Sequence, residues 1–118
     1  MKCYIFDIDG TIEHMQPVLH ALMTIHDVVF VSGRPEHTRK DTVAWLRKHN
    51  FWFAIPDPKL YMRRDREYRP TLKVKRELLD RLRGDGYVPQ LVFDDRDQVV
   101  NMWRDAGIPC VQVAPGDF

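Results

Sequence analysis

The chain has 118 residues, of which 44% are hydrophobic and 30% charged, and its formal net charge is +1. This length suits a single domain over residues 1–118 with a real hydrophobic core, and the near-neutral balance excludes both charge-driven disorder and a polycationic coat. The sequence has neither an apolar run of roughly 18–20 residues nor the order of a signal peptide, so we expect a cytoplasmic protein without membrane contact.

Short β-rich runs alternate with helical patterns along the chain. The predicted strands are Cys3–Phe6, Val28–Val31, Trp52–Ile55, Leu91–Phe93 and Cys110–Val113. The predicted helices are Val18–Ile25, Thr38–His49, Leu72–Arg83 and Val99–Ala106. Pro56–Pro70 is predicted to be a loop with room for a short strand at Leu60–Met62. Five strands alternating with four helices indicate an α/β, three-layer, Rossmann-like fold, with a mostly parallel five-stranded sheet and helices on both faces.

The net charge conceals two biases in composition. Of the 17 acidic residues 13 are aspartates, and aspartate suits turns, oxygen-ligand metal sites and carboxylate chemistry better than helix surfaces. The segment Lys59–Arg83 holds 10 of the 18 lysines and arginines against 4 acids. A basic stripe therefore lies inside a chain whose remainder is acidic.

Aspartates follow two of the predicted strands directly. Asp7 and Asp9 come after the first strand, and Asp94 and Asp95 after the fourth. Ligands of open parallel sheets bind outside the carboxyl ends of the strands, and converging carboxylates need a cation. An all-oxygen donor set favours Mg²⁺, so these four residues are the predicted metal site. The alternative is that each pair is an ordinary acidic turn between a strand and a helix.

A second set of polar residues could bind phosphate. Ser32, Gly33 and Arg34 follow the second strand at a predicted helix N-terminus, where a hydroxyl, free amides and a guanidinium suit an anion. Lys75 falls inside the apolar stripe of its helix, between Leu79 and Leu82 in angular position, so its ammonium needs an acidic or anionic partner. The alternatives are an ordinary turn at Ser32 and a lysine that reaches solvent past the sheet edge.

These residues in this order resemble the haloacid dehalogenase-like phosphatase superfamily. The first motif would be residues 7–11, the second Ser32, the third Lys75 and the fourth Asp94 with Asp95. Residues 93–100, 102–104 and 112–118 look in addition like the 3′-phosphatase domains of bacteriophage polynucleotide kinase/phosphatases. The likeness covers essentially the whole chain.

The resemblance implies a mechanism with named roles. Asp7 would attack phosphorus to form an aspartyl-phosphate, and Asp9 would act as general acid and base. Mg²⁺ would bind to the Asp7 carboxylate, the Asp9 carbonyl and one or both of Asp94 and Asp95. The catalytic residues Ser32 and Lys75 and the substrate-binding residues Thr11, Gly33 and Arg34 would surround the phosphoryl group.

The expected substrate is a nucleic-acid end. Neither interval that holds a cap domain in this superfamily is long enough for one here, so we expect an uncapped, open site. The stripe arginines Arg63, Arg64, Arg66 and Arg69 could form a groove that tracks phosphates. The alternative is a solvated arginine-rich loop.

The resulting hypothesis is a Mg²⁺-dependent phosphomonoesterase that removes the 3′-terminal phosphate from DNA or RNA, in the host cytoplasm if the protein is phage-encoded. No glycine precedes a lysine, so the GxxxxGK[ST] motif of a kinase half is absent and a separate kinase or ligase partner is possible. Two alternatives stay open. One is a small-molecule phosphatase acting on nucleotides or sugar phosphates, and the other is a non-catalytic nucleic-acid-binding module.

Overall fold

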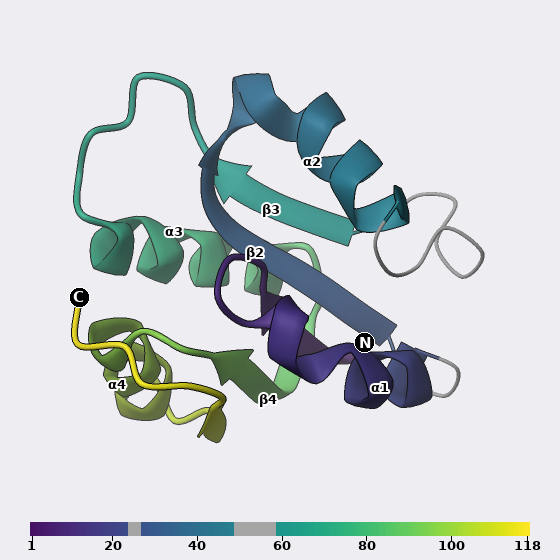
Figure 1. The fold of residues 1–118 in the computed structure, drawn as a ribbon. Coiled ribbons are helices and arrows are strands. Elements are labelled where there is room, and N and C mark those ends of the chain that lie inside the picture. The colour runs from purple at the N-terminus through teal and green to yellow at the C-terminus, as the bar shows by residue number, and fades with distance from the viewer. Residues whose placement is uncertain (24–26, 49–58) are drawn as a thin grey trace.

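A computed structural model describes residues 1–23, 27–48 and 59–118 (Figure 1). The strands are β1 (Lys2–Asp7), β2 (Asp27–Pro35), β3 (Lys59–Arg63), β4 (Val88–Asp94) and β5 (Cys110–Gln112). The helices are α1 (Ile12–Met23), the short 3₁₀ helix η1 (Glu36–Thr38), α2 (Arg39–Leu46), α3 (Thr71–Gly84) and α4 (Asp97–Asp105). Within these described ranges no helix is both long and apolar enough to cross a membrane.

The strands form one parallel sheet in the order β3-β2-β1-β4-β5, with β1 at its centre. Phe6 of β1 is in register with Phe30 of β2 and with Phe93 of β4. Because the strands are parallel, their carboxyl ends lie along one edge of the sheet. The expected α/β fold with a parallel sheet is confirmed.

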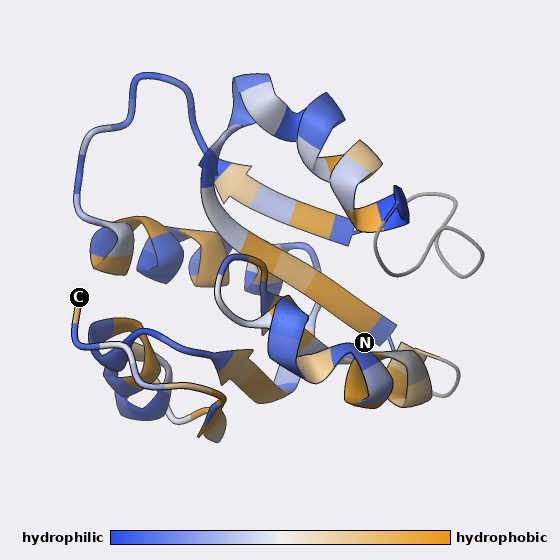
Figure 2. Ribbon diagram, viewed as in Figure 1, coloured by the Kyte–Doolittle hydropathy of each residue, from blue (hydrophilic) through white to orange (hydrophobic). Residues whose placement is uncertain are grey.

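Two hydrophobic cores lie on opposite faces of the sheet. Successive residues of a strand point to opposite sides, so Ile5 packs into the core shared with α3 and α4 while Phe6 packs into the core shared with α1 and α2. Both side chains are fully buried, and Phe6 stacks on Phe93 with ring centroids 4.5 Å apart. Figure 2 shows a long apolar stretch along β2 and apolar residues interspersed with polar ones along the helices. This two-sided burial produces the predicted three layers.

The third strand of the sheet differs from the sequence prediction. The expected strand Trp52–Ile55 lies outside the described residues, and the edge strand is Lys59–Arg63, inside the segment predicted to be a loop. The buried residues Leu60 and Met62 alternate with more exposed neighbours, as in a strand with one solvated side. The short strand expected at Leu60–Met62 is therefore the core of β3.

The first helix begins six residues earlier than its predicted start at Val18. The carbonyl of Ile8 accepts the amides of Thr11 and Ile12, which starts the helix directly after the turn at residues 8–11. Pro17 lies inside α1, where its ring removes one helical hydrogen bond. Burial of Ile12 and Leu19 offsets that loss, so proline marks no boundary here.

Strand β2 is longer than predicted and changes the setting of the second motif. It extends to Pro35, with an irregularity in its pairing to β3 between Ser32 and Pro35. Residues 32–34 thus belong to the end of a strand, and η1 separates them from α2. The connections after β1 and after β3, residues 8–11 and 64–70, are short and contain no folded unit.

Candidate active site

Three buried carboxylates converge at the carboxyl edge of the sheet. Asp7 is the last residue of β1, Asp94 is the last residue of β4, and Asp95 follows it. One oxygen of each lies within 4.8 Å of the others, and all three side chains are buried. The parallel register of β1 and β4 is what brings residues so distant in the sequence together.

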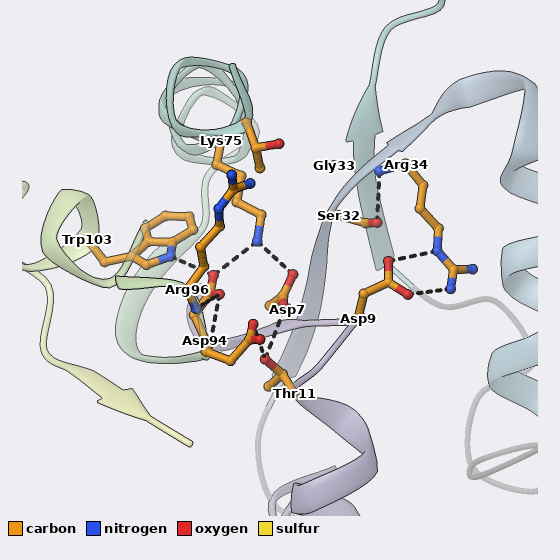
Figure 3. Close-up of polar contacts among 12 residues, drawn as sticks. Asp7, Asp9, Thr11, Ser32, Gly33, Arg34, Lys75, Asp94, Arg96 and Trp103 are labelled. Atoms are coloured by element: carbon orange, nitrogen blue, oxygen red, sulfur yellow. Dashed lines mark hydrogen bonds and ion pairs between the residues drawn. The ribbon is translucent and has the colours of Figure 1, made fainter. Parts of the chain in front are cut away.

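Lys75 lies between two of these carboxylates, as Figure 3 shows. Its Nζ donates to Asp7 Oδ1 at 2.6 Å and to Asp94 Oδ2 at 3.0 Å. Burial disfavours the ammonium, but the two carboxylates outweigh burial and raise the pKa of Lys75 above its ordinary value. The partner predicted for this lysine from its helical position is therefore present, and Lys75 does not reach solvent.

The orientation of Asp94 is fixed by further donors. The indole Nε1 of Trp103, a fully buried residue of α4, donates to Asp94 Oδ2 at 3.2 Å. The backbone amide of Asp95 donates to Asp94 Oδ1 at 2.8 Å. The sequence carries no signal for the indole contact, because the position of Trp103 in the apolar stripe of α4 predicts only packing.

The turn after β1 fixes the other two carboxylates. Thr11 Oγ1 lies 2.9 Å from Asp7 Oδ2 and 3.4 Å from Asp95 Oδ1, and Thr11 is fully buried. Gly10 adopts a φ of +77°, and a Cβ there would lie 2.3 Å from Asp95 Oδ2. Glycine is thus required for both the turn and the close approach of Asp95. Thr11 orients both carboxylates, and its contact with substrate stays a prediction.

The charge of the cluster fits a divalent cation. Asp7, Asp94 and Asp95 are opposed by one buried ammonium, that of Lys75, so the buried groups retain excess negative charge. Burial raises the pKa of Asp7 to about 7, against the lowering effect of Lys75. A cation bound to these oxygens would offset the cost of burying them, and an all-carboxylate donor set suits Mg²⁺.

Asp9 points away from the three carboxylates toward Arg34 (Figure 3). Arg34 Nη2 donates to Asp9 Oδ1 at 2.6 Å and Nε donates to Oδ2 at 3.0 Å. The Asp9 side chain is 62% exposed. Its carboxylate therefore does not join the three buried carboxylates. The resemblance implies that Asp9 binds the metal through its backbone carbonyl, and this position of the side chain is compatible with that role.

The residues of the second motif lie beside this pair. Ser32 is buried, and its Oγ accepts a hydrogen bond from the backbone amide of Arg34 at 3.1 Å. The hydroxyl proton of Ser32 therefore points away from that amide. The carbonyl of Gly33 accepts Nε of Arg63 at 2.8 Å. The end of β2 is thus held in a fixed shape next to the carboxylates.

A pocket of about 270 Å³ opens over the cluster. It is lined by Asp7, Asp9, Gly33, Arg34, Thr71, Lys75, Asp94, Asp95, Arg96 and Phe118. Most residues predicted for the metal and the phosphate therefore share one cavity. Arg96 and Phe118 were not predicted.

The four stripe arginines do not line this pocket. Arg63 donates to the carbonyls of Gly33, Glu67 and Arg69 and to Thr71 Oγ1, so it holds the loop of residues 64–70.

Arg64, Arg66 and Arg69 lie on the same loop, and all three are exposed to solvent. Arg69 forms ion pairs with Glu67 and Glu77, and Arg64 lies 3.6 Å from Glu77. Arg69 lowers the pKa of Glu67 to about 2. Arg66 is exposed and adopts a φ of +61° in the same loop. Three of the four stripe arginines are thus bonded within the protein, and a groove that tracks phosphates stays a prediction.

A model of the phosphatase domain of polynucleotide kinase PNKP matches residues 13–118. The chain belongs to this family. Asp7, Asp9 and Thr11 precede the matched range, so their assignment to the candidate site rests on the hydrogen bonds described above. The family agrees with the haloacid dehalogenase-like resemblance of the sequence motifs.

One viral protein and two solved structures are similar to this chain. A protein of Autographa californica nuclear polyhedrosis virus, named "Putative bifunctional polynucleotide kinase/RNA ligase", is 36% identical over 92 residues, which are 76% of this chain and 13% of that protein. Two solved structures, a Pnkp1/Rnl/Hen1 complex and the Pnkp1/Rnl/Hen1 RNA repair complex, match 99% of this chain at 30% identity with TM-scores of 0.86. This chain covers 47% and 43% of the matched chains.

Proposed function

We propose that this chain is a Mg²⁺-dependent phosphomonoesterase that removes the 3′-terminal phosphate from DNA or RNA ends. The observation that carries the proposal is the Asp7 carboxylate, held between Lys75 and Thr11 at the floor of a small polar pocket. Membership of the polynucleotide kinase phosphatase family supports the reaction class. The RNA-repair setting of the structural relatives supports the substrate class.

In this mechanism Asp7 is the nucleophile. One of its oxygens attacks phosphorus, the bond from phosphorus to the 3′ oxygen breaks, and an aspartyl-phosphate forms. Lys75 neutralises charge on Asp7 in the resting site and is positioned to contact the phosphoryl oxygens during transfer. A Mg²⁺ ion held by Asp7, Asp94 and Asp95, with the Asp9 carbonyl, would supply further positive charge to those oxygens.

Asp9 is the proposed general acid and base. Once released by Arg34, its carboxylate takes a proton from solvent, gives that proton to the leaving 3′ oxygen, and later takes one from the water that hydrolyses the aspartyl-phosphate. In the resting structure both of its oxygens accept bonds from Arg34. Asp9 must therefore exchange Arg34 for the substrate oxygen, and the released guanidinium is then available to bind the phosphate beside Ser32 and the Gly33 amide.

A small-molecule phosphatase acting on nucleotides or sugar phosphates is a second candidate. It is favoured by the stripe arginines, none of which lines the pocket, and Arg63, Arg64 and Arg69 are bonded to glutamates or carbonyls of the protein. A free nucleotide needs only the pocket itself, whereas a polymer needs contacts beyond it.

The relatives suggest where the proposed reaction belongs. Removal of a 3′ phosphate leaves a 3′ hydroxyl, which is the group that a ligase joins to a 5′ phosphate. The viral relative combines kinase and ligase activities by name, so we propose that such activities, on another domain or another chain, use this product.

One panel of substrates tests the function. Phosphate release is measured with Mg²⁺ or EDTA on a 3′-phosphorylated oligonucleotide, a 5′-phosphorylated one, a 2′,3′-cyclic phosphate end and a nucleoside 3′-monophosphate. We expect metal-dependent release, with the highest kcat/KM on the 3′-phosphorylated oligonucleotide. Equal or higher kcat/KM on the mononucleotide would support the second candidate. No release from any substrate, at wild-type folding, would contradict both.

A further inference from the structure

The segment of residues 113–118 returns across the turn that carries the metal-binding carboxylates. Val113 N donates to the carbonyl of Asp94 at 3.0 Å, and the carbonyl of Gly116 accepts the Asp97 amide at 2.7 Å. Gly116 packs so closely that a Cβ there would lie 2.1 Å from the carbonyl oxygen of Asp95. Figure 1 shows this segment ending near the start of α3, beside the pocket. Its path is therefore fixed by the active-site turn itself.

This path places an exposed aromatic ring at the catalytic pocket. Phe118 is 60% exposed and lines the same cavity as Asp7 and Lys75. Arg96 holds it, because its Nε donates to the Phe118 carbonyl at 2.5 Å and its guanidinium carbon lies 5.2 Å from the ring centroid. A ring left largely in water gains little from core packing, so packing does not account for its position.

The size of the pocket indicates what such a ring could contact. About 270 Å³ is slightly below the roughly 300–1,000 Å³ typical of small-molecule sites, so the cavity suits a phosphate and its sugar. The base of that nucleotide would then lie at the mouth. Nucleobases bind proteins by stacking on aromatic rings, and guanidinium groups add cation–π contacts.

We propose that Phe118 and Arg96 form a stacking platform for the base of the terminal nucleotide whose phosphate reaches Asp7. The platform rests on the proposed function, since it requires a nucleotide substrate. It recognises the presence of a base and not its identity, because every base has a face to stack. It also gives the enzyme a contact with nucleic acid that does not depend on the stripe arginines.

The test compares two oligonucleotides that differ only in the base of the 3′-phosphorylated residue, present in one and replaced by hydrogen in the other. Wild-type kcat/KM should be about 10-fold higher with the base, as expected for one stacked base. Phe118→Ala should remove this preference, and Phe118→Trp should keep it. Tyr68→Ala is the matched control, because Tyr68 is 89% exposed and does not line the pocket.

Several results would overturn the platform. One is a wild-type enzyme that hydrolyses both oligonucleotides equally well, and another is a Phe118→Ala variant that loses the same factor on both. Failure of the proposed function looks different, since neither oligonucleotide would then release phosphate. In that case the platform is tested by comparing kcat/KM on a nucleoside 3′-monophosphate with kcat/KM on a pentose 3-phosphate, which lacks the base. Melting temperatures of all variants show whether the fold is kept.

Discussion

Arg34 donates hydrogen bonds to both oxygens of the Asp9 carboxylate, from Nη2 at 2.6 Å and from Nε at 3.0 Å. Arg34 also lies over the Trp45 ring, with its guanidinium carbon 5.7 Å from the centroid, and its Nη1 lies 3.4 Å from Thr42 Oγ1. The guanidinium is thus supported on several sides while it holds the proposed general acid. Its planar fork cannot be reproduced by a lysine.

We therefore expect Arg34→Lys to lower kcat/KM on a 3′-phosphorylated oligonucleotide by roughly 100-fold, the size typical of losing one donor to a developing charge. Arg39→Lys is the matched control, because Arg39 bonds to Glu36 and to the Leu60 carbonyl, away from the pocket. Steady-state phosphate release measures both variants. An Arg34→Lys enzyme as active as the Arg39→Lys enzyme would contradict the role given to Arg34.

Asp7→Asn should abolish turnover while the protein stays folded. The amide keeps the shape of the side chain but is too weak a nucleophile, so we expect a loss of at least about 10³-fold. The substitution also removes one of three crowded carboxylates, and Lys75 keeps Asp94 as a partner, so folding should survive. Circular dichroism melting accompanies the kinetic assay. A folded variant with near wild-type turnover would rule out Asp7 as nucleophile.

Trp103→Phe tests the indole donor to Asp94. The change keeps an aromatic ring in the core but leaves Asp94 Oδ2 without one hydrogen bond, so Asp94 should be less well oriented. We expect the Mg²⁺ concentration for half-maximal activity to rise about 10-fold or more, together with a loss of about 1–3 kcal/mol in the free energy of unfolding. Magnesium titration and denaturant unfolding measure the two effects. Lower stability with an unchanged magnesium requirement would assign Trp103 to packing alone.

The salt dependence of kcat/KM distinguishes a groove of unpaired arginines from arginines that are paired within the protein. If Arg64 and Arg69 stay paired with Glu67 and Glu77, the logarithm of kcat/KM on an oligonucleotide should fall only weakly with the logarithm of salt concentration. Each additional phosphate contact on a single strand adds a slope of about −0.7. Glu77→Gln frees Arg64 and Arg69 from one partner and should steepen the slope by about that amount.

The control for this series is p-nitrophenyl phosphate, whose hydrolysis should show little salt dependence with either enzyme. A wild-type slope near −3 on the oligonucleotide would correspond to about four phosphate contacts, and it would restore the groove as part of the substrate path.

The central part of the site could be predicted from the sequence because it depends on regular structure. Parallel strands place Asp7, Asp94 and Asp95 at one edge whatever the loops do, and the helical period alone puts Lys75 on the buried side of α3. These relations follow from backbone geometry, which apolar patterns report well.

The remaining features depend on side-chain partners that no periodic pattern reports. The basic stripe is defined only by the number of lysines and arginines in one segment. That number does not show that Arg69 pairs with Glu67 or that Arg63 donates hydrogen bonds to backbone carbonyls. The bond between Trp103 and Asp94 depends on the depth of one helix against the sheet. Only the segment Leu60–Met62 of β3 was expected, inside a predicted loop, because the strand occurs among prolines and charges that are typical of loops.

Gly10 connects the shape of the backbone to the composition of the candidate metal site. The volume that a side chain at position 10 would fill is already taken by the Asp95 carboxylate, at 2.3 Å from an ideal Cβ. Any larger residue there would be strained at this φ and would push the Asp95 carboxylate, a candidate ligand, out of its position. A change at position 10 would therefore reach the candidate metal site through Asp95, although residue 10 itself offers no ligand.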